Sequence, residues 1–459
     1  MSVFSLSNLK KTWYYLQKNG IRNAVWAVLE RIGQEQEVYT WQEPDEKTLS
    51  FQREHSASLR ISIVVPAYRT KKEHLEAMLN SVSRQSYPHW ELIVADAGGT
   101  AESVQAWAKK NGICLREAAD ASNLAEWKDR SIVLCTLSEN KGISANTNAG
   151  IELAAGDAVG LLDHDDLLTA NALWEMADCL EKEKKRGKQK LVLFSDEDKC
   201  DKAASRFYEP NFKPDFDGEL LLTNNYICHF TVIETAFLKE LKLRSGFDGA
   251  QDYDLMLRAY AAGGQFVHVP KVLYHWRCHE ASTASNPQSK RYAYEAGQRA
   301  LEDYCLRKGW KVTVSGLKHL GFYREDYEDS VFCQRPEIGI WAKPLPGGRD
   351  IFGIRHPKGF LVSGLYENDG SMRYAGLRKG YSGPMHRAAL QQSAPAADLR
   401  SMEVCSALKE RYAQTIAELK EACQGLPTAA QETKILQKSM EFCKEATAAG
   451  YGILWDPQA

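Results

Sequence analysis

The sequence predicts an α/β fold with a mostly parallel, Rossmann-like sheet, and two observations carry that prediction. Apolar runs rich in β-branched residues recur, namely ISIVVP (61–66), ELIVAD (91–96), SIVLCT (131–136), AVGLLD (158–163) and LVLFSD (191–196). Such runs are typical of strands buried on both faces. Helical stretches lie between them, at Glu73–Arg84, Ala101–Lys110 and Ser144–Ala155. Strands that alternate with helices form βα units and a parallel sheet.

The length of 459 residues predicts more than one domain, because a single core rarely grows that large. We expect a helical N-terminal segment with a linker over residues 1–59 and the α/β domain over 60–315. A smaller α+β domain should follow over 316–459, where turn-rich segments such as KPLPGGRD precede two helical stretches, Ala407–Cys423 and Ala429–Ala449. The linker prediction rests on the polar, acidic and irregular character of residues 33–59.

The N-terminal segment is basic and partly amphipathic. Its first 32 residues carry Lys10, Lys11, Lys18, Arg22 and Arg31 against the single acidic residue Glu30. A helix of this kind can lie on an anionic membrane surface. Docking of a helical hairpin onto the next domain explains the same pattern equally well.

Composition excludes several classes of protein. A formal net charge of −2 gives no reason to expect a nucleic-acid partner. The 11 cysteines are scattered without a CxxC pair, which indicates reduced thiols in a cytoplasmic protein. No stretch approaches the roughly 20 apolar residues of a membrane helix, and no signal-peptide core is present. We therefore expect a cytoplasmic protein, at most peripheral to the membrane.

Carboxylates stand at the ends of three of the predicted strands. They are Asp96, Asp163 and Asp196. In parallel sheets ligands bind at the carboxyl ends of the strands. One such carboxylate could cap a helix, whereas three at one edge favour a binding site.

The segment LLDHDDLL (161–168) brings Asp163, Asp165 and Asp166 together. Carboxylate oxygens are the ligands that Mg²⁺ and Mn²⁺ prefer, and a cation would relieve the repulsion between them. Asp163 and Asp165 have the D-x-D spacing of such a site. An Asp-rich turn that opens the next helix fits that spacing equally well, and Asp166 is expected only to cap that helix.

Two further segments add polar groups. NKGISANTNAG (140–150) runs through Gly142 into a helix whose N-terminal N–H groups face solvent or a phosphate; helix capping is the simpler explanation. Asp252 and Asp254 open a later amphipathic helix. The helix dipole explains one of them, and the other could be a general base for a hydroxyl group.

Together these segments resemble the inverting, nucleotide-sugar-dependent glycosyltransferases of family 2, which have the GT-A fold. The resemblance rests on ISIVVPAYRT, WELIVADAGGT, ENKGISANTNAGIELAAGDAVGLLDHDDLLT, LVLFSDEDK, FKPDFDGELLLTNNYICH, GAQDYDLMLR and VLYHWRCHEAST, in the family's order over about residues 61–285. The nearest branch builds bacterial O-antigen, rhamnan and related surface polysaccharides.

The resemblance implies roles for individual residues. Asp252 would be the general base, and Asp163 and Asp165 would bind Mg²⁺ or Mn²⁺, with Asp165 the direct ligand. The nucleotide-binding positions would be Pro66, Ala67, Tyr68, Asp96, Asn140, Gly142, Asn148 and Asp163. Donor or acceptor contacts would involve Asp196, Gln251, His275, Arg277 and His279. Ala97 and Gly99 stand where the family usually has an acid and a serine. The resemblance therefore does not imply the family's usual base and ribose contacts at these two positions.

The implied partners are a UDP- or dTDP-type sugar donor and a glycan acceptor, typically lipid-linked, at the cytoplasmic face of the inner membrane. The implied reaction is the transfer of a sugar to a hydroxyl of a growing surface polysaccharide.

The C-terminal part contains a short segment that repeats a segment of the first domain. AAGGQFVHVP (261–270) aligns without a gap with AAGYGILWDP (448–457), although one such match could arise by chance. No second DHDD occurs, and Ser439 stands where Asp252 falls in the aligned repeat. We therefore expect a shortened, inactive second transferase-like module.

Three other functions fit the sequence less well. A non-catalytic nucleotide-sugar-binding scaffold would not need Asp163, Asp165 and Asp252 together. A nucleotidyltransferase would need a Gly-rich loop after the first strand, and PAYRTKKEHLEAM lacks the glycines. A dehydrogenase would need the G-x-G-x-x-G fingerprint, which is absent.

Overall fold

The structure of the protein is a computed structural model. It describes residues 39–119, 127–278, 291–317, 321–342, 364–365, 402–422, 438 and 441–455. The basic segment at residues 1–32, His279 and Ser439 lie outside the described residues, so the predictions made for them stay predictions.

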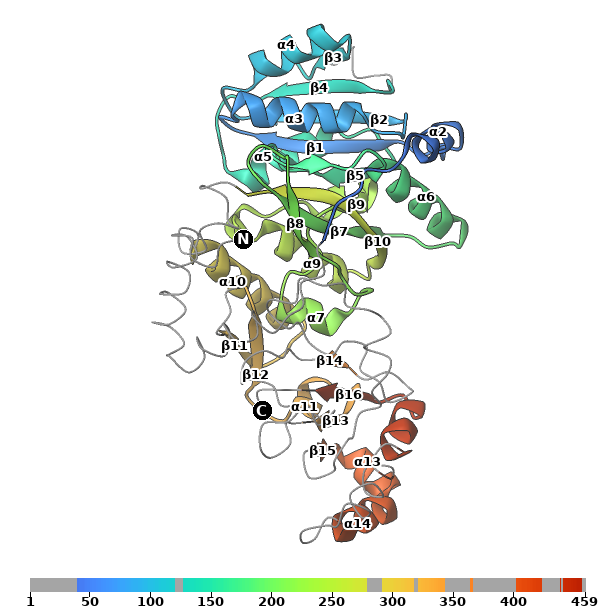
Figure 1. Cartoon of the computed structure of the whole chain (residues 1–459). Coiled ribbons are helices and arrows are strands. Elements are labelled where there is room, and N and C mark those ends of the chain that lie inside the picture. The colour runs from blue at the N-terminus through green and yellow to red at the C-terminus, as the bar shows by residue number, and fades with distance from the viewer. Residues whose placement is uncertain are drawn as a thin grey trace, which may run out of the picture.

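A ten-stranded mixed sheet fills the upper half of the molecule in Figure 1, in the order β3-β4-β2-β1-β5-β9-β7-β10-β6, with β8 paired to β7. The strands are β1 (Ile61–Ala67), β2 (Trp90–Asp96), β3 (Cys114–Glu117), β4 (Ser131–Thr136), β5 (Ala158–Leu161), β6 (Leu167–Leu168), β7 (Leu191–Cys200), β8 (Phe207–Asn211), β9 (Thr231–Glu234) and β10 (Gln265–Arg277). All five strands expected from the apolar runs are present, which confirms the α/β class.

Helices cover both faces of this sheet. They are α3 (Lys72–Ser83), α4 (Ala101–Asn111), α5 (Ile143–Leu153), α6 (Ala172–Lys185), α7 (Gly218–Thr223), α8 (Thr235–Leu241), α9 (Gln251–Ala261) and α10 (Arg291–Arg307). Successive residues of β1 point into different cores, since Ile63 and Val65 pack with α3, α4 and α6 whereas Val64 packs with α5, α7, α8, α9 and α10. This alternation explains why the strands are apolar throughout.

One strand reverses the direction of the sheet at its centre. β9 lies antiparallel to β5 on one side and to β7 on the other, while β1, β2, β4 and β5 run parallel to one another. β7 also continues to Cys200, so Asp196 lies inside the strand and not at its end. The placement of Asp196 at the acidic edge was therefore wrong by several residues.

The segment expected to be a linker contains a packed helix, α2 (Glu46–Glu54). Its N-cap, Asp45, accepts a hydrogen bond from the backbone of Thr48. Gln52 is buried, donates to Glu175 on α6 and accepts from the hydroxyl of Ser86. α2 is thus part of the folded α/β unit.

The hairpin of β11 (Val312–Gly316) and β12 (Tyr323–Tyr327) crosses the domain boundary expected between residues 315 and 316. The short helix α11 (Val331–Gln334) follows. Just beyond α11, Arg335 makes a buried two-pronged ion pair with Glu219 on α7, with N–O distances of 2.6 and 2.7 Å. Residues up to 335 therefore pack with the first domain.

The described C-terminal strands form a separate sheet in the order β14-β16-β13-β15, which lies at the end of the molecule away from β3 and β4 (Figure 1). The elements are β13 (Ile338–Ala342), β14 (Gly364–Leu365), β15 (Met402–Val404), α13 (Ser406–Arg411), α14 (Ala413–Ala422) and β16 (Gly452–Trp455).

The two similar sequence segments, 261–270 and 448–457, share a backbone motif. After α9, Gly263 has φ +77°, its N–H donates to the carbonyl of Tyr260, and the N–H of Gly264 donates to Ala259. Gly450 has φ +90°, its N–H donates to Thr447, and the N–H of Tyr451 donates to Ala446. Both are the same glycine-terminated helix end, and each leads into a strand, β10 or β16, with a parallel neighbour.

None of the helices among the described residues is both long and apolar enough to cross a membrane.

Candidate active site

The D-x-D loop joins β5 to the two-residue strand β6. Asp163, His164 and Asp165 are half-buried in it, and the N–H of Leu162 donates to Val64 of β1 at 3.2 Å. The loop thus extends from the carboxyl end of a central strand, where ligands bind in such sheets.

The charges around Asp163 are crowded. Burial raises the pKa of the Asp163 carboxyl, the ring of His229 opposes the rise, and the carboxylates of Asp165 and Asp252 add to it. Asp252 comes from α9, 89 positions further along the chain than Asp163, so the fold brings together the two acidic segments that the sequence singled out. A bound cation would offset this repulsion.

Asp166 does not cap a helix, contrary to the expectation. It is 1% exposed and accepts hydrogen bonds from the hydroxyl of Tyr274 at 2.5 Å and from the backbone N–H of Arg277 at 2.7 Å. Helix α6 begins later, with Asn171 at its N-cap. Asp166 therefore ties the D-x-D loop to β10.

The guanidinium of Arg277 strengthens the same connection. Its Nε donates to the carbonyl of Asp165 and its Nη1 to the carbonyl of Lys202, both at 2.6 Å. The side chain is buried, and Nη2 has no hydrogen-bond partner among the described residues. Arg277 thus supports the backbone of the proposed metal loop, and its expected contact to the donor stays a prediction.

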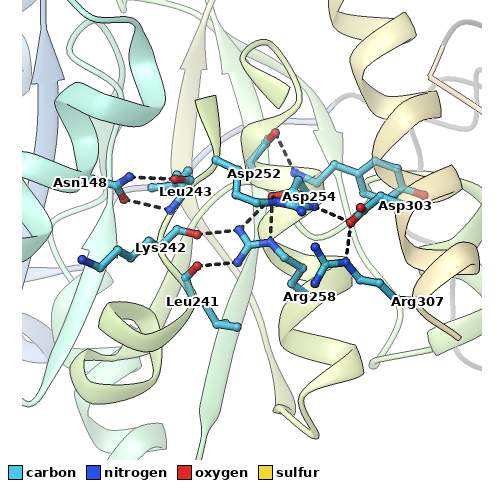
Figure 2. Close-up of polar contacts among 11 residues, drawn as sticks. Asn148, Leu241, Lys242, Leu243, Asp252, Asp254, Arg258, Asp303 and Arg307 are labelled. Carbon is cyan, nitrogen blue, oxygen red and sulfur yellow. Dashed lines mark hydrogen bonds and ion pairs between the residues drawn. The ribbon is translucent and has the colours of Figure 1, made fainter. Parts of the chain in front are cut away.

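Asp252 and Asp254, two residues apart on α9, have different environments. Asp254 is buried and paired with Arg244 and Arg258, and Arg244 continues to Asp303 at 2.7 Å (Figure 2). Asp252 is half-buried, and its two oxygens accept from Asn225 Nδ2 at 3.0 Å and from the N–H of Tyr253 at 2.9 Å. Asp254 is thus structural, whereas Asp252 has no basic partner among these contacts and its charge acts on Asp163 of the D-x-D loop.

The carboxylates of the D-x-D loop fit a divalent cation whose remaining ligands are waters and substrate phosphates. Among the described residues no three His, Cys, Asp or Glu side chains are grouped as a metal cluster. Asp163 and Asp165 nevertheless supply hard oxygen ligands, and Mg²⁺ commonly binds through one or two carboxylates plus waters and substrate phosphates. The buried Nδ1 of His164, between them, has no partner among the described residues.

The expected nucleoside positions surround the ends of β1 and β2. Pro66 and Ala67 end β1, and Tyr68 is 40% exposed with the guanidinium of Arg69 5.0 Å from its ring centre. The Asp96 carboxylate accepts from the N–H groups of Gly98, Thr100 and Ala101, so it caps α4.

The backbone conformation of the loop that departs from the family pattern favours its glycines, whereas the space around Gly98 would admit a β-carbon. Gly98 and Gly99 have φ values of +138° and +83°, which other residues rarely adopt. A β-carbon on Gly98 would lie 3.6 Å from the ring of Tyr68.

Two N–H groups at the start of α5 donate to side chains of the protein itself. Asn140 accepts from the N–H of Gly142 at 3.1 Å, and Asp248 accepts from the N–H of Ser144 at 3.3 Å. Asn148 exchanges two hydrogen bonds with the backbone of Leu243, at 2.8 and 2.9 Å (Figure 2). These contacts agree with helix capping and loop support, and the nucleotide roles of the three predicted residues stay predictions.

The remaining predicted residues have mainly structural partners. Asp196 accepts from the N–H of Lys213 and contacts His268 at 2.8 Å. Gln251 accepts from the N–H of Gly249. His275 is buried with its Nδ1 2.5 Å from Asp198. The donor and acceptor contacts proposed for these side chains therefore rest on the resemblance alone.

Sequence reasoning missed two side chains close to the acidic cluster. Asn225 contacts Asp252, and the ring of His229 affects the charge of Asp163 while stacking on Tyr274 with ring centres 5.0 Å apart. Both belong to the segment NNYICH (224–229), whose polar residues in an otherwise apolar stretch were the available signal.

Residues 62–241 match the family model described as Glycosyl transferase family 2. This segment, which includes the central strands and the acidic loop, is therefore similar to that family.

Individual relatives share the same part of the chain. It is 37% identical over 250 residues to the uncharacterized protein y4gI of Sinorhizobium fredii, covering 54% of this chain and 25% of that protein. It is 34% identical over 256 residues to the O-antigen biosynthesis protein RfbC of Myxococcus xanthus, covering 56% of this chain and 19% of that protein. The chain therefore matches a quarter or less of the length of these relatives.

Among solved structures, S. aureus TarS 1–349 in complex with UDP aligns with a TM-score of 0.39 and 18% identity. That alignment covers 54% of this chain and 66% of that one.

Proposed function

We propose that the chain transfers a sugar, with inversion, from a nucleoside-diphosphate donor to a hydroxyl of a growing surface polysaccharide. The observation that carries this proposal is the approach of Asp252 to the D-x-D loop, close enough for its charge to raise the pKa of Asp163. A base opposite a diphosphate-binding loop is the arrangement that a direct displacement requires. The similarity to the O-antigen protein RfbC supports the polysaccharide context.

In the proposed reaction the acceptor oxygen attacks the anomeric carbon as its proton passes to Asp252. The bond from that carbon to the diphosphate oxygen breaks, and the nucleoside diphosphate leaves with the electron pair. Asp163 and Asp165 would hold Mg²⁺ or Mn²⁺, which when bound supplies positive charge to the leaving diphosphate. Asp166 and Arg277 keep the loop that carries these carboxylates against β10.

The direct test replaces Asp252 by Asn, which keeps the shape of the side chain but cannot accept the proton. Donors are first chosen by screening UDP-, dTDP- and GDP-sugars for thermal stabilisation with Mn²⁺. We expect Asp252→Asn to lower transfer by at least about 100-fold, the usual contribution of a general base, and to leave calorimetric nucleotide affinity nearly unchanged. Asp129→Asn, at a partly exposed position beside His89, is the matched control. Full transfer by Asp252→Asn would exclude Asp252 as the base.

The same experiment separates the second candidate, a non-catalytic scaffold that binds nucleotide sugars. That candidate requires metal-dependent binding by the unmodified chain without transfer to any acceptor. Its support is that Asn140 and Asp248 already accept from the N–H groups of Gly142 and Ser144 at the start of α5. The proximity of Asp252 to Asp163 favours the enzyme.

We further propose that the C-terminal part is a shortened and inactive second module. The gap-free match of residues 261–270 with 448–457 supports this proposal, and in both segments a helix that ends at a glycine, Gly263 or Gly450, leads into a strand with a parallel neighbour. The hairpin that crosses residues 315 and 316, together with the ion pair of Arg335 with Glu219, supports a start of the module after about Arg335.

Attachment to the cytoplasmic face of the inner membrane through residues 1–32 and use of a lipid-linked acceptor are also proposed. The excess of basic residues in that segment supports them. Co-sedimentation of the chain with anionic and with neutral vesicles tests the membrane proposal; equal recovery with both would contradict it.

A further inference from the structure

Asn225 lies at the proposed catalytic base but has no assigned role. It follows Asn224, the C-cap of α7, and its Nδ2 donates to Oδ2 of Asp252 at 3.0 Å. The other oxygen of Asp252 accepts from the N–H of Tyr253 on its own helix. Asn225 therefore provides a contact from outside α9 that restricts the orientation of the Asp252 carboxylate.

The orientation of the amide shows which contact dominates. With Nδ2 directed at Asp252, the amide oxygen Oδ1 is buried and has no hydrogen-bond partner among the described residues. An unsatisfied buried acceptor is costly, whereas a hydrogen bond to a carboxylate is stronger than one between neutral groups. Asn225 thus directs its donor group at Asp252, and its side chain also hydrogen-bonds the buried thiol of Cys228.

The backbone that carries Asn225 is held from several sides. Asn224 forms an isolated antiparallel bridge with Phe322, and its side chain donates to the hydroxyl of Thr223 at 3.1 Å. At the other end of α7, Glu219 is held by the two bonds from Arg335. A side chain on such a fixed element can orient another group within a narrow range.

We propose that Asn225 is a positioning residue that holds the Asp252 carboxylate toward the acceptor hydroxyl. This inference rests on the proposed function. A neutral amide suits the position, because Asp252 already lies near Asp163 and a further negative charge would add repulsion. The attacking oxygen must meet a correctly placed base, and a misplacement of about 1 Å can cost roughly 100-fold in rate.

The test compares Asn225→Ala and Asn225→Asp with the unmodified chain. Asn225→Asp keeps the shape of the side chain but removes the donor, so it retains the packing that Asn225→Ala loses. We expect kcat to fall about 10- to 100-fold in Asn225→Ala and further in Asn225→Asp. The donor KM and the calorimetric nucleotide affinity should stay within about twofold, because a residue that acts through the base affects chemistry and not ground-state binding.

Asn111→Ala is the matched control. Asn111 donates its amide to the carbonyl of Trp107 at 2.9 Å at the end of α4, so the variant loses a similar bond away from Asp252. Its kcat should equal that of the unmodified chain.

Two results would overturn the inference. One is kcat within about twofold of the unmodified value in both Asn225 variants; the other is a joint loss of kcat and nucleotide affinity, as a purely structural role would produce. Neither affects the proposed function if the unmodified chain transfers sugar and Asp252→Asn does not. A lack of transfer by the unmodified chain overturns both proposals.

Discussion

The ion pair between Arg335 and Glu219 allows a quantitative prediction. Its bonds measure 2.6 and 2.7 Å, and the two side chains are 5% and 6% exposed. The guanidinium also lies 4.9 Å from the ring centre of Trp310. In Arg335→Met the apolar stem is retained, but Glu219 is left buried without this partner.

Breaking a buried pair in this way costs about 3–5 kcal/mol, mainly because the remaining charge stays desolvated. At roughly 1.4 kcal/mol per factor of ten, that loss lowers the folding equilibrium constant by two to four orders of magnitude. In the double variant Arg335→Met/Glu219→Leu no charge remains buried at the pair. Its loss of stability should therefore be smaller than that of Arg335→Met alone.

Urea denaturation followed by tryptophan fluorescence measures both effects, because Trp310 lies beside the pair. Lys72→Met, which removes an exposed pair with Glu76 at 3.9 Å, is the control and should change stability by less than about 1 kcal/mol. A loss below about 1 kcal/mol in Arg335→Met, or a double variant as unstable as the sum of the single ones, would refute the reasoning.

Three further predictions concern the metal loop and the charge of a buried histidine. Asp165→Ala should weaken metal-dependent nucleotide binding in calorimetry by at least about tenfold, as loss of a metal ligand would; unchanged binding would remove Asp165 from the site. Tyr274→Phe removes the hydroxyl that donates a hydrogen bond to Asp166. The buried carboxyl then lacks one donor, which should lower the free energy of unfolding in urea by about 1–3 kcal/mol. No measurable loss would contradict the role of Asp166. His268 lies between Asp196 and Asp215, and although burial lowers its pKa, these two bonds outweigh burial and raise it. The charged form therefore stabilises the fold fully below about pH 6.5 and less as the pH rises through the higher folded value, so the stability advantage over His268→Gln should be largest near pH 6 and decline in alkaline buffer; an advantage that grows with pH would have the wrong sign.

The central strands were predictable because they are apolar throughout. Ile61–Ala67 and Trp90–Asp96 pack against helices on both faces, which leaves a continuous apolar run in the sequence. The reversed strand β9 was missed because Thr231–Glu234 is only four residues long and its direction is set by neighbours far away in the chain. Pairing of that kind has no local signature.

The acidic cluster was predictable in part for a similar reason. Asp163 and Asp252 stood out as charges next to apolar segments, and the fold brings them together. The sequence could not show which other carboxylates belong to the candidate site. Asp254 and Asp196 have the same side chain as Asp252, but Asp254 pairs with Arg244 and Asp196 with His268. Which carboxylate is free for chemistry depends on partners that only the folded chain supplies.

Synthesis of the chain gives the Arg335–Glu219 pair a further consequence. The two residues are 116 positions apart, and Glu219 leaves the ribosome first. Until Arg335 follows, docking of α7 would bury a carboxylate without this counter-charge, which is unfavourable. That cost disfavours docking of α7, which precedes Asn225, while the chain has been made only to residue 315. The order of translation therefore favours assembly of the proposed catalytic centre after the hairpin and α11 have been made.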